Sequence, residues 1–209
     1  LSQGVQDEDS DDVLTGDTGP VGRVAFVFPG QGSQWADMGR DLYERVPLFR
    51  RTLDRCGRAL APFVDWDLAD IVSGRAGTDW LDRVDVVQPV LWATSVALAE
   101  LWRAAGVEPD VVVGHSQGEV SAATVSGALS HEDAARVVAM RSAAVRAIAG
   151  KGLMMAVELD PEAAQRSLEG FEDLVSVAVN NGPTSCVLSG EADSVLVLKE
   201  LLEADGVDC

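Results

Sequence analysis

The segment 110–128 constrains the fold of this chain more than any other part of the sequence. A short apolar run, Val111-Val112-Val113, leads into Gly114-His115-Ser116-Gln117-Gly118, and small residues that suit a tightly packed helix follow. The pattern G-x-S-x-G between a strand and a helix predicts a sharp turn that lifts the serine hydroxyl off the end of a sheet. A Gly-Ser-rich turn without a catalytic role would look similar, so the flanking strand and helix carry the argument. Ser116 is therefore the candidate nucleophile.

Strands and helices alternate around this segment. The apolar run 23–28 ends at Pro29-Gly30, a pattern typical of a strand that is buried on both faces of a parallel sheet. Pro89 is expected to open a helix, and Ser130 to cap another helix that covers 131–148. Parallel strands joined by helices predict an α/β fold for residues 21–150.

The rhythm changes after Gly152, and residues 151–209 are expected to form a small subdomain. The predicted elements are a strand, a helix, two strands separated by a turn at Asn180-Asn181-Gly182-Pro183, and a helix; their ranges are 153–159, 161–169, 174–179, 185–189 and 192–204. This βαββα order is one strand short of the ferredoxin-like plan. The missing strand would begin near Val207, so we expect the subdomain to be truncated.

Composition excludes several classes of function. The formal charge of −18 argues against nucleic-acid binding, which requires a basic face. Three separated cysteines and two histidines suggest no metal site, and no apolar run approaches the length of a membrane span. Residues 1–20 hold six acidic side chains and no Lys or Arg, which is typical of a solvated linker.

The loop after the first strand, GQGSQW (30–35), lies at the same edge of the predicted sheet as Ser116. It is no dinucleotide fingerprint, because Trp35 stands where the third glycine would be. The backbone N–H of Gln31 is a candidate oxyanion donor, and the backbone N–H of Gln117 is the other. The loop could equally be a simple turn, and the residues alone leave both interpretations open.

Three separated motifs, FPGQGSQW (28–35), GHSQGE (114–119) and NNGPTSCVLSG (180–190), resemble the acyltransferase domains of modular polyketide synthases. The resemblance covers about residues 21–209 and implies an α/β-hydrolase-like core with a ferredoxin-like subdomain. It implies that Ser116 takes an acyl group from a coenzyme A thioester and passes it to the phosphopantetheine thiol of an acyl carrier protein. It also implies no permanently bound cofactor, a neighbouring ketosynthase domain with its linker, and a role in antibiotic biosynthesis. The three separated cysteines favour reduced thiols in a cytoplasmic protein.

Arg141 is the candidate carboxylate-binding residue. Apolar neighbours one turn away on the predicted helix place its guanidinium on an apolar face, where a charge needs a partner. A planar guanidinium suits a carboxylate, so we expect Arg141 to face Ser116 across a pocket for a malonyl-type thioester. The alternative is a structural ion pair with an Asp or Glu.

The resemblance extends to substrate preference. RVDVVQ (83–88) together with Gln117 resembles the pattern of methylmalonyl-type domains, with malonyl-CoA as the alternative extender. The implied specificity residues are Val86, Val87, Gln88 and Gln117.

Neither histidine is a good general base for Ser116. His115 precedes the serine in a turn that should aim the two side chains apart, and His131 is expected to be a solvated residue at a helix start. The resemblance places the catalytic histidine beyond Cys209, so we expect little activity from these residues alone. Two other functions stay open: a serine hydrolase such as a thioesterase, and an inactive structural piece of a megasynthase.

Overall fold

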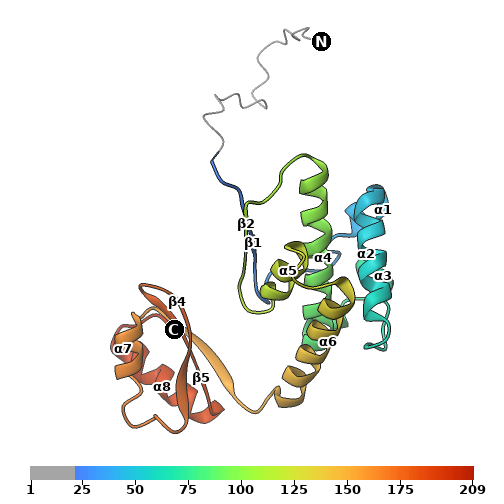
Figure 1. The fold of residues 1–209 in the computed structure, drawn as a ribbon. Coiled ribbons are helices and arrows are strands. Elements are labelled where there is room, and N and C mark those ends of the chain that lie inside the picture. Colours follow the sequence, from blue (N-terminus) through green and yellow to red (C-terminus); the bar gives the residue numbers. More distant parts are fainter. Residues whose placement is uncertain (1–21) are drawn as a thin grey trace, which may run out of the picture. The chain divides into compact units, whose positions relative to one another are not determined.

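The structure, a computed structural model, describes residues 22–209, so the predicted acidic linker lies outside the described residues (Figure 1). The chain divides into two compact units. The first contains Val87–Val138 and the residues up to Leu81, and the second combines Asp82–Val86 with Ala139–Cys209. Each unit is described by itself below.

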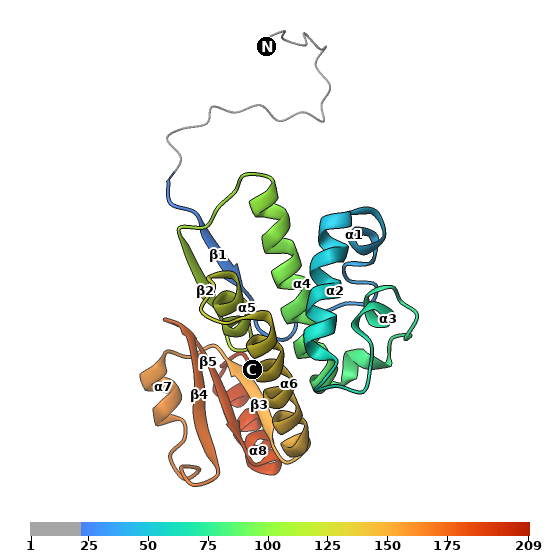
Figure 2. The same ribbon diagram turned by 45° about the vertical axis from the view of Figure 1, so that its right-hand side comes forward.

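The sheet of the first unit is parallel, as the sequence predicts. Strand β1 (Ala25–Phe28) pairs with β2 (Val111–Gly114), with Ala25 opposite Val111 and Phe28 opposite Gly114. The two strands run side by side in Figures 1 and 2, and helix α5 (Gly118–Val125) packs against both of them. The carboxyl ends of both strands therefore meet at one edge, where the motif loops begin.

Burial of this sheet differs from the prediction. The first strand was expected to be buried on both faces, but Val27 is 69% exposed, and on β2 Val111 and Val113 are 49% and 51% exposed. Among the described residues the two strands pair only with each other, so each is an edge strand and its side chains lack neighbours from a further strand on one side. The prediction of a doubly covered strand is wrong for this part of the chain.

Helices form the core of the first unit. Helices α1 (Arg40–Arg45), α2 (Pro47–Leu60) and α3 (Leu68–Val72), with the 3₁₀ turn η1 (Asp79–Asp82), follow β1. Their buried side chains include Phe49, Leu53, Leu60, Val72 and Trp80. Across the unit, the indole Nε1 of the fully buried Trp92 donates to Thr124 Oγ1 on α5 at 3.0 Å, which ties α5 to the helical core.

Helix α4 (Val84–Ala104) begins earlier than predicted. Pro89 lies inside the helix rather than opening it. Pro costs one backbone hydrogen bond there, but Val86 and Val87 ahead of it are buried, and this packing keeps the segment helical. By length and composition α4 could cross a membrane, whereas the sequence is predicted to hold no apolar run of that length. However, 67% of that stretch is buried within the structure, as in the core helix of a water-soluble protein.

Helix α6 (His131–Ile148) matches its predicted range. Ser130 Oγ accepts a hydrogen bond from Asp133 N at 3.0 Å and donates to Asp133 Oδ2 at 2.8 Å. This reciprocal pair satisfies a backbone donor of the first turn and holds the carboxylate there. Gly150, with φ 79°, follows the end of the helix.

The second unit folds as the predicted βαββα. Its elements are β3 (Leu153–Val157), α7 (Pro161–Arg166), β4 (Val175–Gly182), β5 (Ser185–Gly190) and α8 (Ala192–Ala204). The strands form an antiparallel sheet in the order β3-β5-β4. The turn between β4 and β5 is tighter than predicted, because Asn180 and Gly182 still pair with β5, through bulges.

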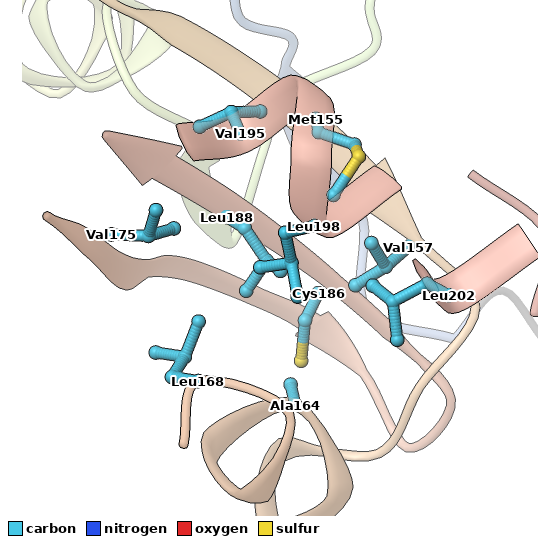
Figure 3. Packing of buried hydrophobic residues seen from close by; sticks show 10 residues of the cluster. All are labelled: Met155, Val157, Ala164, Leu168, Val175, Cys186, Leu188, Val195, Leu198 and Leu202. Carbon is cyan, nitrogen blue, oxygen red and sulfur yellow. The ribbon is translucent and has the colours of Figure 1, made fainter. Parts of the chain in front are cut away.

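A continuous apolar core holds the second unit together (Figure 3). Alternate strand residues such as Met155, Cys186 and Leu188 point to one face of the sheet, where α7 and α8 supply Ala164 and Leu198. Both helices therefore cover the same face. The core residues are Met155, Val157, Ala164, Leu168, Val175, Cys186, Leu188, Val195, Leu198 and Leu202.

Candidate active site

Ser116 lies in a sharp turn between β2 and α5. Its φ of 54° is in the left-handed region, which residues other than glycine rarely adopt. The turn is held by backbone hydrogen bonds from His115 N to Phe28 O and from Gly118 N to His115 O, both at 2.9 Å. Ser116 is exposed, whereas Gln117 and Gly118 are buried. A strained serine held this way has the geometry of a nucleophile elbow.

The two glycines of the motif are required by close backbone contacts. A Cβ on Gly114 would lie 2.3 Å from Glu119 N, and a Cβ on Gly118 would lie 2.2 Å from Phe28 O. Neither contact is possible for a real side chain, and in each case the neighbour is backbone. The elbow therefore depends on both glycines through packing.

The loop after β1 contacts the elbow, as its place at the sheet edge predicts. A Cβ on Gly30 would lie 3.0 Å from His115 Nδ1 and 3.4 Å from Ser116 Cβ. Gln31, the next residue, is exposed at this edge. The structure thus brings the segment carrying Gln31 next to the one carrying Ser116 and Gln117.

Two glutamine side chains hold this loop. Gln117 is only 1% exposed, and its Nε2 donates to Pro29 O at 3.2 Å. Gln88, which is 5% exposed, donates from Nε2 to Gln31 Oε1 at 3.1 Å. Two residues that the resemblance links to substrate preference therefore contact the loop after β1.

The charged residues of RVDVVQ have a structural role in the second unit. Arg83 Nη2 lies 2.7 Å from Asp85 Oδ2, and Arg146 Nη1 from α6 lies 2.9 Å from the same oxygen. Burial raises the pKa of Asp85, but the hydrogen bond and positive charge of Arg83, with the charge of Arg146, outweigh it, so this pKa is lowered. The pair of arginines thus ties the start of α4 to the end of α6.

Arg141 lies on α6 within the second unit and is half-buried. Ser116 belongs to the first unit, so the predicted approach of the guanidinium to the serine stays a prediction.

His131 differs from its prediction, because its ring is half-buried and packs edge-on against Trp92, with centroids 6.5 Å apart. Burial and the nearby positive charge of Arg55 lower the pKa of His131, which favours a neutral ring.

Sequence reasoning missed the role of Pro29 and the Asp85–Arg146 ion pair. Pro29 acts through its carbonyl oxygen, which every residue type possesses, and its partner Gln117 is 88 positions away. Asp85 and Arg146 are 61 positions apart. No local pattern signals contacts of such separation. Within residues 22–209 no group of three or more His, Cys, Asp or Glu side chains is placed to hold a metal.

The elbow geometry, the contacting loop and the α/β order are features found in α/β enzymes that act on acyl groups. The family described as the acyl transferase domain matches residues 25–209. The chain belongs to this family, and its relatives are modular polyketide synthases.

Polyketide synthase GfsB of Streptomyces halstedii is 53% identical over 195 residues, which cover 93% of this chain and 4% of that protein. The acyltransferase domain from module 8 of the salinomycin polyketide synthase has a TM-score of 0.84 at 49% identity, covering 89% of this chain and 44% of that one. MCAT from Streptococcus pneumoniae has a TM-score of 0.74 at 36% identity, covering 88% and 60%. The chain thus spans a small fraction of the curated relative's length and about half of the solved domains.

Proposed function

We propose that Ser116 is the acyl-carrying nucleophile of a polyketide synthase acyltransferase. The observation that carries this proposal is the serine's left-handed φ of 54° in a turn whose glycines and backbone hydrogen bonds leave it little freedom. A nucleophile held in this way needs no reorganisation before it attacks. Membership in the acyl transferase domain family supports the same reaction.

The proposed reaction is a ping-pong exchange. Ser116 Oγ attacks the thioester carbonyl of an acyl-CoA and gives its proton to a base. The carbon–sulfur bond then breaks, and the CoA thiol leaves with a proton. The phosphopantetheine thiol of an acyl carrier protein next attacks the acyl-serine ester, takes the acyl group and restores the serine hydroxyl. The base is the histidine that the family resemblance places beyond Cys209.

The backbone N–H groups of Gln31 and Gln117 are the proposed oxyanion donors. Gln117 is the N-cap residue of α5, and Gly30, directly before Gln31, contacts the elbow. Donors at a helix amino terminus face a developing negative charge favourably. One such donor typically contributes about 3 kcal/mol to stabilising the transition state.

The proposed substrate is an extender unit with a free carboxylate, most simply methylmalonyl-CoA. Arg141 would bind that carboxylate through its planar guanidinium. The resemblance of RVDVVQ and Gln117 to methylmalonyl-type domains supports the methyl branch over malonyl-CoA. An acyl carrier protein and a ketosynthase domain are the proposed partners, in the cytoplasm.

We propose that the second unit is a ferredoxin-like subdomain. The order β3-β5-β4 corresponds to strands one, three and two of that plan. Glu158 N, at the open edge of β3, donates to Asp208 O at 3.0 Å, where the remaining strand would pair. We propose residues 1–20, 21–150 and 151–209 as linker, core and subdomain.

The test uses the full-length protein that carries this sequence. We expect methylmalonyl-CoA to acylate the peptide that contains Ser116, with release of free CoA, as measured by mass spectrometry. Ser116→Ala should abolish the adduct without altering thermal unfolding. Transfer of the acyl group to a carrier-protein thiol supports a transferase. Rapid transfer to water in the presence of that thiol would instead identify a thioesterase, and an unmodified Ser116 would end the proposal.

A further inference from the structure

The side chain of Gln117 does not share the exposure of its neighbour. Ser116 is exposed, but Gln117 is turned into the first unit, and its amide nitrogen donates to the carbonyl of Pro29. Its Oε1 is buried and has no hydrogen-bond partner among the described residues. A buried amide that leaves one atom unpaired costs stability. Such a cost is typical of a group that is kept for function.

We propose that Gln117 is a positioning residue, whose side-chain amide holds the loop Pro29–Gln31 against the elbow and thereby sets the distance between the two oxyanion donors. This inference rests on the proposed function of Ser116. It gives the side chain of Gln117 a role that is distinct from that of its backbone N–H. It also explains why a residue next to the nucleophile is buried rather than directed at the substrate.

The loop is fixed at three consecutive residues. Gln117 Nε2 donates to Pro29 O at 3.2 Å, and Gln88 Nε2 donates to Gln31 Oε1 at 3.1 Å. Between them, Gly30 lies so close to the elbow that an added Cβ would be 3.0 Å from His115 Nδ1. The orientation of the Gln117 amide follows from its partner, because a carbonyl oxygen accepts only from the NH₂ end. Removing this donor frees the loop directly before Gln31.

The two possible roles of Gln117 predict different kinetics. A side chain that touched the substrate would change the preference among acyl groups. A side chain that positions an oxyanion donor acts on the thioester carbonyl, which all acyl-CoA substrates share. Its loss should lower kcat for every substrate by a similar factor and leave KM nearly unchanged.

The experiment compares Gln117→Met and Gln117→Glu in the full-length protein that carries this sequence. Methionine has a similar length but no donor, and CoA release would be followed with methylmalonyl-CoA, malonyl-CoA and propionyl-CoA. We expect a fall in kcat of about 10- to 100-fold, equal for the three substrates, because a displacement near 1 Å has an effect of this size. Gln165→Met, an exposed glutamine on α7, is the matched control and should change nothing.

Gln117→Glu makes the hydrogen-bond donor at this position depend on pH. The ionised carboxylate would place a negative oxygen beside the Pro29 carbonyl, whereas the protonated acid can donate in place of the amide. Burial raises the pKa of a carboxyl group. The rate of this variant relative to the unaltered protein should therefore increase as the pH falls from about 8 to about 6.

The outcomes separate the inference from the proposed function. If the unaltered protein forms no acyl-Ser116, the proposed function fails and the inference falls with it. If acyl-Ser116 forms but Gln117→Met keeps its kcat, or changes the ratio among the three substrates, only the positioning role is overturned. A flat relative pH profile for a folded Gln117→Glu, with unfolding followed by tryptophan fluorescence, would also overturn it.

Discussion

The two compact units use their sheets in different ways. In the second unit, α7 and α8 cover one face of β3-β5-β4 and enclose a continuous apolar core (Figure 3). In the first unit, β1 and β2 leave Val27, Val111 and Val113 exposed, and β2 leads into the turn that carries Ser116. Among the described residues, this sheet is therefore supported by α5 and by the backbone contacts of the turn around Ser116.

Buried polar groups show the same contrast. Five buried side-chain N or O atoms of the described residues have no hydrogen-bond partner, and all five belong to the first unit. They are found in Thr94, Arg103, Gln117, Ser121 and His131. Unsatisfied polar atoms lower stability, so among the described residues this cost falls on the first unit, where Gln117 directly follows Ser116.

The largest expected effect comes from breaking the elbow. In Gly118→Ala the new Cβ would lie 2.2 Å from Phe28 O, so β1 and the turn must separate. We expect acyl loading in the full-length protein to fall by about 1,000-fold, because both Ser116 and the proposed oxyanion donors move. CoA release with methylmalonyl-CoA measures this.

Gly57→Ala is the matched control in the same unit. Gly57 lies inside α2, and its added Cβ would meet Leu68 Cβ at an ordinary 3.5 Å. This variant should be more stable by about 0.5–1 kcal/mol and fully active. Equal activity of the two variants would show that the glycine contacts of the elbow do not matter.

The second expected effect tests the core of the second unit. Leu188 is fully buried in that core, so Leu188→Ala should lower the free energy of unfolding of this unit by about 3 kcal/mol. Hydrogen exchange of amides in β3 and β5 measures this loss. Leu196→Ala, on the exposed side of α8, should cost less than about 0.5 kcal/mol.

Tryptophan fluorescence separates the two units in the same samples. All five tryptophans, Trp35, Trp66, Trp80, Trp92 and Trp102, belong to the first unit. Their unfolding transition should not shift in Leu188→Ala. If the tryptophan transition shifts together with the hydrogen exchange of β3 and β5, the two units unfold as one. The difference between their cores would then not make them independently stable.

Local signals account for what the sequence predicts well. The Ser130 cap defines the start of α6, and the predicted range 192–204 is that of α8, because a polar start and a continuous apolar side specify a helix within its own segment. The G-x-S-x-G turn is equally local. Each of these features depends on residues that are close in sequence.

Features that depend on distant residues are predicted poorly or not at all. Pro89 suggests a helix start, but the buried residues before it extend α4 back to Val84. The exposure of Val27 depends on how many strands pair with β1, which its own sequence does not encode. The amide contact between Gln117 and Pro29 lacks a sequence signal for the same reason.

The third prediction concerns Arg141, which belongs to the second unit, whereas the proposed nucleophile Ser116 belongs to the first. If its guanidinium binds the extender carboxylate, Arg141→Ala should slow loading from methylmalonyl-CoA by about 10- to 100-fold and spare propionyl-CoA. Arg136→Ala, an exposed arginine on the same helix, should alter neither rate. Equal losses for the two substrates in Arg141→Ala would show that Arg141 supports the fold and does not bind the carboxylate.

The smallest expected effect is a pH dependence of stability that is confined to the first unit. Both histidines lie in this unit, and burial against Trp92 and other side chains lowers the pKa of His131. An unfolded chain then binds a proton more readily than the folded one, so this contribution to stability is complete above about pH 6.5 and declines as the pH falls below that value.

Thermal unfolding at about pH 7.5 and pH 5.5 measures this dependence, with tryptophan fluorescence reporting on the first unit and hydrogen exchange on the second. The first unit should lose less than about 1 kcal/mol at the lower pH, and His131→Gln should reduce that loss, because an uncharged amide cannot take up the proton. The second unit, which has no histidine, is the internal control. If His131→Gln loses as much stability at the lower pH as the unaltered protein, the titrating group is not His131. The half-buried histidine would then not account for a difference between the two units.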